Sequence, residues 1–201
     1  MAAYSDHTLS DLLDEVAAQS PAPGGGCSAA WTAGLAAGLV EMSASFTLAR
    51  PRYAGVHHRM LDVRKQATLA RRRLVELAEE DGSNYEPVLA ALRLPEKHRD
   101  REQRLDEARS NAAETPLAIA EAAAEIAELA AETARVGSEH LRGDAITGAL
   151  LAEGACRASG RLVEINLAGR VDPRLARTFE ATRRAGAARD EALRVREEVL
   201  R

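Results

Sequence analysis

Two aspartates and one glycine-rich loop are the residues of this sequence whose types and spacing best suit chemistry. Asp81 follows a long helical pattern and directly precedes Gly82, where we expect the helix to break and a side chain to face a cleft. Asp144 follows the short loop Gly137–Gly143, at the start of another helical pattern. A carboxylate in a partly dry cleft can act as a general acid or base. The competing interpretation is that Asp81 is solvated and that Asp144 caps its helix.

The glycine-rich loop, residues 21–28, reads Pro-Ala-Pro-Gly-Gly-Gly-Cys-Ser and precedes an apolar segment that we expect to be helical. Its prolines disfavour helix in the residues before them, and its glycines let the backbone approach a ligand closely. Unpaired N–H groups and the helix dipole favour an anionic or carbonyl-bearing ligand at such a place. The alternative is a simple turn. The loop lacks the Gly-Lys-Ser/Thr ending of a P-loop and the preceding strand of a dinucleotide site.

The sequence offers no metal-binding motif. It contains no His-Glu-x-x-His pattern, and the adjacent His57 and His58 point to different faces of a helix. Cys27 and Cys156 are too few for a disulfide scaffold and lack the spacing of metal ligands. Cys27 stands at an expected helix N-terminus, where a thiol pKa can be lowered, although a buried and inert thiol is the commoner case.

The composition bounds the class of protein. A chain of 201 residues fits one domain, so we expect a single domain over residues 1–201. Aromatic residues make up only 3%, so Ala, Leu, Val and Ile must build the core. A net charge of −4 argues against a nucleic-acid partner, which usually needs a basic face. Residues 1–19 carry acids and no apolar core, so we expect no signal peptide and a cytoplasmic location.

The long segments have helical period, and none is a convincing strand. Leu9, Leu12, Leu13 and Val16 form one helical stripe, with Thr8 as its N-cap. The sequence predicts an all-α bundle of seven or eight helices. The main expected helices cover residues 27–49, 53–80, 115–137, 143–168 and 173 onward.

The segment Cys27–Leu48 has 22 residues and a single charge, so by length and composition it could span a membrane. Its small residues and its carboxylate, Glu41, favour a buried helix in a bundle over a membrane span. Gly34 and Gly38 would let another helix approach closely, either within the bundle or between subunits. We therefore expect no membrane partner.

Taken in chain order, these features resemble the cyclodeaminase/cyclohydrolase family. This family comprises the cyclodeaminase domain of formiminotransferase-cyclodeaminase and the stand-alone methenyltetrahydrofolate cyclohydrolases. The resemblance spans about Leu9 to Asp172. The segments that carry it are Pro21–Gly26, Thr47–Tyr53, Asp81–Tyr85, Leu94–Arg104, Thr115–Leu117, Asp144 and Ile165–Leu167.

The resemblance implies a helical bundle that pairs into a homodimer or higher homo-oligomer, with folate bound near the glycine loop. It implies that Asp81 is the catalytic acid and base and that Asp144 orients a pterin nitrogen or supports Asp81. The residues that it implies for substrate binding are Pro23, Gly24, Gly25, Gly26, Ser28, Arg52, Tyr53, Arg104 and Asn166.

Two folate reactions are implied, and neither needs a metal or a redox cofactor. One is hydrolysis of 5,10-methenyltetrahydrofolate to 10-formyltetrahydrofolate, and the other is cyclisation of 5-formiminotetrahydrofolate with release of ammonia. The alternative is a catalytically inactive helical homo-oligomer that binds folate or a partner. It is motivated by Ser138 and Gly143, which depart from the family's Asn and Ser.

Overall fold

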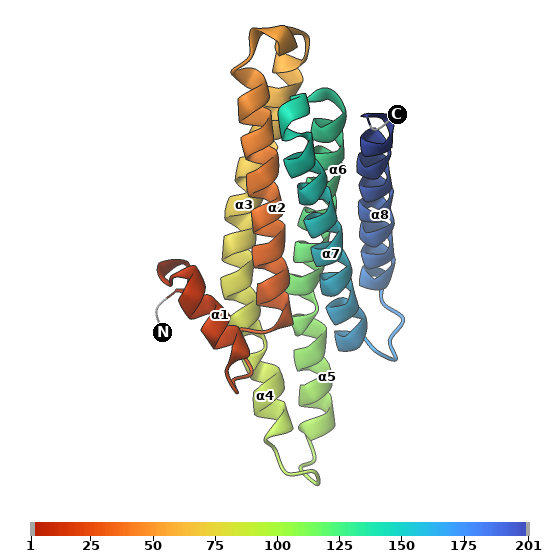
Figure 1. Ribbon diagram of the computed structural model, residues 1–201. Coiled ribbons are helices and arrows are strands. Elements are labelled where there is room, and N and C mark those ends of the chain that lie inside the picture. The colour runs from red at the N-terminus through yellow and green to blue at the C-terminus, as the bar shows by residue number, and fades with distance from the viewer. Residues whose placement is uncertain (1–2, 200–201) are drawn as a thin grey trace.

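The protein is a bundle of long helices, described by a computed structural model for the backbone of residues 3–199 and the side chains of residues 3–195 (Figure 1). Residues 3–199 form eight α-helices, three short 3-10 helices and no strand, which confirms the all-α prediction. The α-helices are α1 (Leu9–Ala17), α2 (Gly25–Leu48), α3 (His57–Asn84), α4 (Glu86–Leu92), α5 (Arg101–Ala112), α6 (Glu114–Val136), α7 (Arg142–Asn166) and α8 (Pro173–Val199). The 3-10 helices are η1 (Tyr4–Asp6), η2 (Pro51–Val56) and η3 (Glu139–Leu141).

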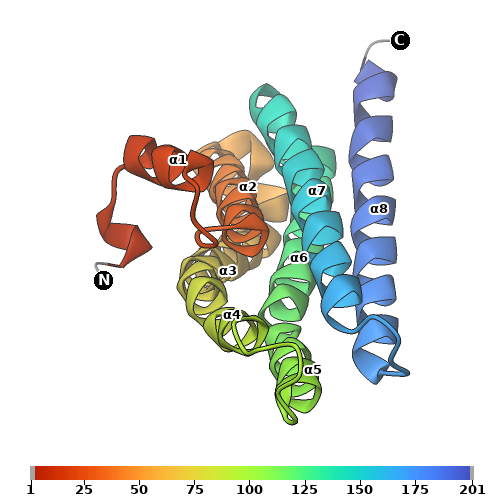
Figure 2. The same ribbon diagram turned by 90° about the horizontal axis from the view of Figure 1, so that it is seen from below.

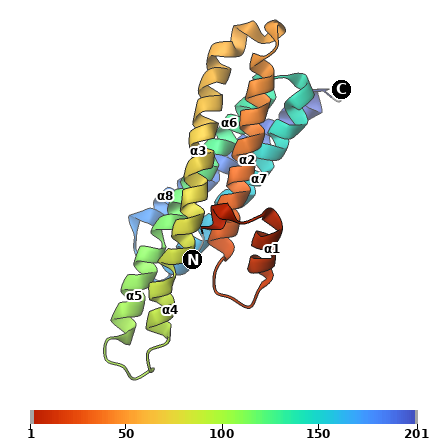
Figure 3. The same ribbon diagram turned by 90° about the vertical axis from the view of Figure 1, so that its left-hand side faces the viewer.

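Helices α2, α3, α6, α7 and α8 run along the long axis of the molecule, with α2 packed against α3, α6 and α7 (Figures 1 and 3). The pair α4 and α5 extends beyond the lower end of the bundle in Figure 1, whereas α1 lies to its side. Seen along the bundle, α8 lies against α6 and α7 on the side away from α1 (Figure 2). Helix ends therefore meet at two opposite ends of the molecule.

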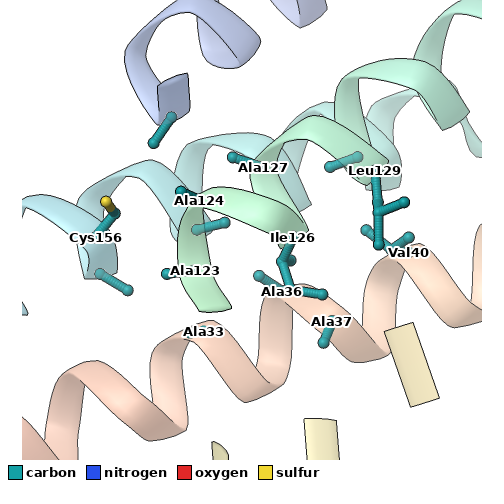
Figure 4. Packing of buried hydrophobic residues seen from close by; sticks show 14 of the residues in the cluster. Ala33, Ala36, Ala37, Val40, Ala123, Ala124, Ile126, Ala127, Leu129 and Cys156 are labelled. Atoms are coloured by element: carbon teal, nitrogen blue, oxygen red, sulfur yellow. The ribbon is translucent and has the colours of Figure 1, made fainter. Parts of the chain in front are cut away.

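Small side chains build the core, as the low aromatic content predicts. Ala33, Ala36 and Val40 of α2 face Ala123 and Ile126 of α6, and all five side chains are fully buried (Figure 4). Helices carrying alanine at their contacts approach closely, so dispersion contacts form between backbones as well as side chains.

Helix α2 contains the segment Cys27–Leu48, which could span a membrane by its length and charge. One long face of this helix is buried in the bundle. Its buried residues are Gly26, Cys27, Ala29, Ala30, Ala33, Ala36, Ala37, Val40, Ser43, Ala44 and Thr47. Among the described helices, none is by itself both long and apolar enough to cross a bilayer. Only α2 taken together with Pro51–Leu92, across a bend of 118°, meets that test.

The end of α3 differs from the expectation at Gly82. We expect a break there, but α3 continues through Gly82 to Asn84, and only then does α4 begin at Glu86. A glycine inside a helix costs up to about 1 kcal/mol relative to alanine, so long-range contacts must outweigh the local preference. The predicted cap of α1 is confirmed, because the Thr8 side chain accepts a hydrogen bond from the Asp11 N–H at 3.2 Å.

Candidate active site

A cavity of about 280 Å³ opens at the end of the bundle where α2 begins and α3 and α7 end. This volume is at the small end for ligand pockets and suits a fused two-ring heterocycle better than a whole tetrahydrofolate. None of the residues that line it is basic. The lining residues are Pro21, Ala22, Gly24, Gly25, Gly26, Asp81, Gly82, Asn84, Tyr85, Ala112, Pro116, Leu162, Ile165 and Asn166.

The glycine loop forms one wall of the cavity by starting α2. Gly24 is the N-cap residue and has no side chain to satisfy the first N–H groups of the helix. Gly26 is buried, and a methyl group placed there would overlap the carboxylate of Asp81. Glycine is required at Gly26 because the side chain of Asp81 rests directly on the backbone of α2.

Asp81 is half-buried on α3 and points at the N-terminus of α2. Burial raises the pKa of its carboxyl, and hydrogen bonding by the Cys27 thiol and backbone N–H partly opposes that shift. Cys27 Sγ lies 3.6 Å from Asp81 Oδ2 and 3.3 Å from the carbonyl oxygen of Ala78. The first turn of α2 thus faces the carboxylate of Asp81. Burial removes this carboxylate from bulk water, and Cys27 donates hydrogen bonds to it.

Cys27 is itself an inert thiol in this setting. Its side chain is fully buried, and burial raises its pKa to about 12. The helix N-terminus therefore does not generate a thiolate at Cys27. Its contact with Asp81 makes Cys27 a support for the carboxylate rather than a nucleophile.

Two amide side chains and the Tyr85 phenol add to the polar lining. Asn166 Nδ2 donates to the carbonyl oxygen of Ala112 at 3.1 Å, and Asn84 Nδ2 donates to Thr115 Oγ1 at 2.8 Å. Within the described part of the chain, the carbonyl oxygens of both amides accept no hydrogen bond and remain available to a ligand with N–H donors. Asn84 was not among the predicted site residues. Since α3 continues through Gly82, Asn84 lies three residues after Asp81 on the same helix face.

Within one chain, only some of the predicted site residues lie together. The structure places Gly24, Gly25, Gly26, Asp81 and Asn166 around one cavity.

Two further residues of the loop lie behind that wall. Pro23 is buried, and the Ser28 hydroxyl donates to the carbonyl oxygen of Gly24 at 2.9 Å. Arg104 lies elsewhere, in a groove between α4 and α5.

Three other predicted site residues lie at the opposite end of the bundle, in η2 and at the start of α7 (Figure 1). They are Arg52, Tyr53 and Asp144, and we call them the distal group. Asp144 is in the first turn of α7 and Asn166 ends that helix, which separates them by roughly 33 Å at the rise of an α-helix. The Tyr53 hydroxyl accepts from Arg52 Nη2 at 2.7 Å and from the Glu139 N–H at 3.1 Å. Within one chain, Asp144 does not reach Asp81.

Replacing Gly26 by alanine is expected to destabilise the protein by about 1–3 kcal/mol, because the new methyl group displaces Asp81. Thermal unfolding followed by circular dichroism measures the loss. The matched control is Gly186→Ala on α8, where no atom lies within 4 Å of the added methyl group and stability should rise by up to about 1 kcal/mol. Equal effects of the two substitutions would show that Asp81 does not pack on Gly26.

No group of three or more His, Cys, Asp or Glu side chains is placed to hold a metal ion within the described residues. The polar groups of the residues that line the cavity are a carboxylate, two amides, the Tyr85 phenol and backbone N–H groups. Such groups bind and orient a heterocycle and can move a proton at the carboxylate.

The chain is similar to known proteins over most of its length. A model of the formiminotransferase-cyclodeaminase family matches residues 8–185. A methenyltetrahydrofolate cyclohydrolase from Methylorubrum extorquens is 29% identical over 169 residues, which cover 82% of this chain and 81% of that protein.

Two further similar proteins are named as cyclodeaminases. The formimidoyltransferase-cyclodeaminase of Rattus norvegicus is 32% identical over 120 residues, which cover 58% of this chain and 22% of the rat protein. The crystal structure of formiminotetrahydrofolate cyclodeaminase from Thermotoga maritima has the same fold, with a TM-score of 0.88 over 98% of this chain and 99% of that one, at 24% identity.

Proposed function

The chain belongs to the formiminotransferase-cyclodeaminase family, and from this premise we propose that it is a folate one-carbon enzyme that hydrolyses 5,10-methenyltetrahydrofolate to 10-formyltetrahydrofolate. The observation that carries the proposal is Asp81, a desolvated carboxyl beside a cavity of pterin size. We also propose that residues 1–201 act as one catalytic domain.

The hydrolytic reaction is supported by the similarity to the cyclohydrolase of Methylorubrum extorquens, which is 29% identical over 82% of this chain. The second candidate reaction is cyclisation of 5-formiminotetrahydrofolate. It is favoured by the name of the Thermotoga maritima protein, whose fold this chain shares.

The proposed hydrolysis needs one group that takes and returns a proton. Ionised Asp81 accepts a proton from the water that attacks the methenyl carbon, and a carbon–oxygen bond forms. When the added hydroxyl loses its proton and becomes the formyl carbonyl, the bond from that carbon to N5 breaks and N5 is protonated. Because the substrate is a cation, one proton is released overall. General acid–base assistance of this kind contributes about 10²–10⁴-fold in rate.

The amides provide a way to orient the ring. The pyrimidine part of a pterin carries an exocyclic amine and a ring N–H, both of which are donors. The free carbonyl oxygens of Asn84 and Asn166 suit these donors, which leaves the carboxylate of Asp81 for the reacting carbon. We propose that these groups hold the ring while the rest of the folate extends out of the cavity.

We propose further that the protein is a homodimer whose partner completes the site. The cavity has no basic side chain to attract the glutamyl tail, and the distal group supplies Arg52. A two-fold axis across α2 would bring the distal group of one subunit near the cavity of the other. Large apolar side chains remain on the outer face of α2, where Leu35 is 64% and Phe46 is 49% exposed.

Two assays on the same purified protein test the proposed reaction. The methenyl chromophore is followed with 5,10-methenyltetrahydrofolate, and ammonia is measured with 5-formiminotetrahydrofolate. Faster loss of the chromophore than in a protein-free blank, without ammonia release from the second substrate, supports hydrolysis. Ammonia release alone assigns the deaminase reaction. Tight folate binding with neither turnover supports the inactive oligomer.

A further inference from the structure

The N-terminal residues 3–7, which we call the N-terminal strap, lie against the end of α3 beside Asp81. They precede residue 8, where the match to the family model begins. The Ser5 N–H donates to Glu79 Oε1 at 3.0 Å, which attaches the strap to α3. On its other side, His7 Nδ1 lies 2.7 Å from Glu15 Oε1 of α1.

Tyr4 is the residue through which the strap contacts the site. Its ring packs edge-on against Trp31 of α2, with ring centroids 5.6 Å apart, and against His7 at 6.4 Å. Its phenol lies over Gly82, so that a methyl group added at Gly82 would be 2.8 Å from the Tyr4 hydroxyl oxygen and 3.0 Å from Cε2. The close approach of Tyr4 explains why a glycine stands inside helix α3.

The titratable groups that act electrostatically on the Tyr4 hydroxyl lie on three elements. They are Cys27 of α2, Glu79 and Asp81 of α3, and Glu15 of α1. Burial, followed by these neighbours, raises the pKa of Tyr4, and the hydroxyl of a tyrosine is a donor at neutral pH even without such a shift. Among the described residues, the Tyr4 hydroxyl donates no hydrogen bond.

We propose that Tyr4 is a positioning residue for Asp81, and that the N-terminal strap excludes water from the side of the carboxyl that faces away from the cavity. Gly26 and Gly82 then act as a pair. Gly26 accommodates the Asp81 carboxylate, and Gly82, the residue next to Asp81, accommodates the Tyr4 ring. The role in catalysis depends on the proposed function, whereas the shielding by the strap does not.

Replacing Tyr4 by alanine tests the role in catalysis. Water reaches Asp81 in this variant and lowers the pKa of its carboxyl, so the acid limb of kcat/KM should move to lower pH. We expect kcat to fall roughly 10- to 100-fold, because Asp81 is no longer held in place. Tyr4→Phe keeps the ring and should leave the acid limb unchanged. An unshifted limb and an unchanged kcat in Tyr4→Ala would overturn the proposal, whereas a lower melting temperature alone would indicate a merely structural role.

A double-mutant cycle tests the contact with Gly82. Gly82→Ala forces the ring away and should lower kcat and move the acid limb as Tyr4→Ala does. In the Tyr4→Ala background the overlap is absent, so adding Gly82→Ala should have no further effect. Additive losses would contradict a shared role of Tyr4 and Gly82.

A labelling experiment separates failure of this proposal from failure of the proposed function. Cys27 is fully buried, and in a Cys156→Ala background it is the single thiol of the chain. Ellman's reagent should label Cys27 slowly when Tyr4 is present and at least tenfold faster in Tyr4→Ala. Equal slow rates overturn the shielding even in an active enzyme. A faster rate in Tyr4→Ala supports the shielding even if the wild-type protein turns over neither folate.

Discussion

Asp81→Asn is expected to abolish turnover while the protein folds normally. The amide keeps the shape of the carboxylate against Gly26 but can no longer exchange a proton, so kcat should fall by about 10²–10⁴-fold. Because burial raises the pKa of Asp81 in the folded state, ionisation of this group costs stability as the pH rises through that pKa. The melting temperature of Asp81→Asn should therefore be higher than that of wild type at pH 7.

Glu80→Gln is the matched control for Asp81→Asn. Glu80 is the next residue of α3, but its carboxylate pairs with Arg73 at 2.6 Å, away from the cavity. Loss of such a partly exposed pair changes stability by no more than about 1 kcal/mol, and turnover should be unchanged. Equal kcat values for wild type and Asp81→Asn would exclude Asp81 as the acid and base.

We expect Asp144→Asn to lose turnover as Asp81→Asn does, and we expect a mixture of these two variants to regain activity. Asp81→Asn lacks the carboxylate in the cavity, and Asp144→Asn changes the distal group at the other end of the bundle. If a site combines the cavity of one subunit with the distal group of its partner, a mixed dimer contains one intact site. After the two variants are unfolded together and refolded, activity should return to about one quarter of wild type, because half of the dimers are mixed.

The double variant provides the control for the mixing experiment. A chain that carries both Asp81→Asn and Asp144→Asn should restore nothing when it is refolded with Asp81→Asn, because no intact pair can form. If mixing of the single variants also restores nothing, the two groups do not act across a subunit interface. Full activity of Asp144→Asn alone would exclude the distal aspartate from the site.

The sequence predicts the helices well because their apolar periodicity is strong and their caps are local. Thr8 is such a cap, and its bond to Asp11 lies within one helical turn. The continuation of α3 through Gly82 is not predictable in this way, since the contact that favours glycine there comes from Tyr4, 78 positions away in the chain. For the same reason Asn84, one turn after Asp81, was not predicted to line the cavity.

The separation of the predicted site residues has a different origin. The 24 residues of α2 span about 35 Å, so residues flanking its two ends cannot meet within one chain. The resemblance groups Gly24–Gly26 with Arg52 and Tyr53 by their order in the sequence, and sequence order does not show which chain supplies each residue. Helix length therefore separates the two groups within one chain, and only the proposed dimer would bring them together.

The proposed role of Asp81 in hydrolysis is tested most directly by the absorbance of 5,10-methenyltetrahydrofolate. It is followed at neutral pH with wild-type protein, with Asp81→Asn and without protein. We expect wild-type protein to accelerate the loss of absorbance well above the spontaneous rate and Asp81→Asn not to do so. Loss at the spontaneous rate with wild-type protein, together with no ammonia release from 5-formiminotetrahydrofolate, would contradict the assignment of Asp81 as the catalytic acid and base of a folate enzyme.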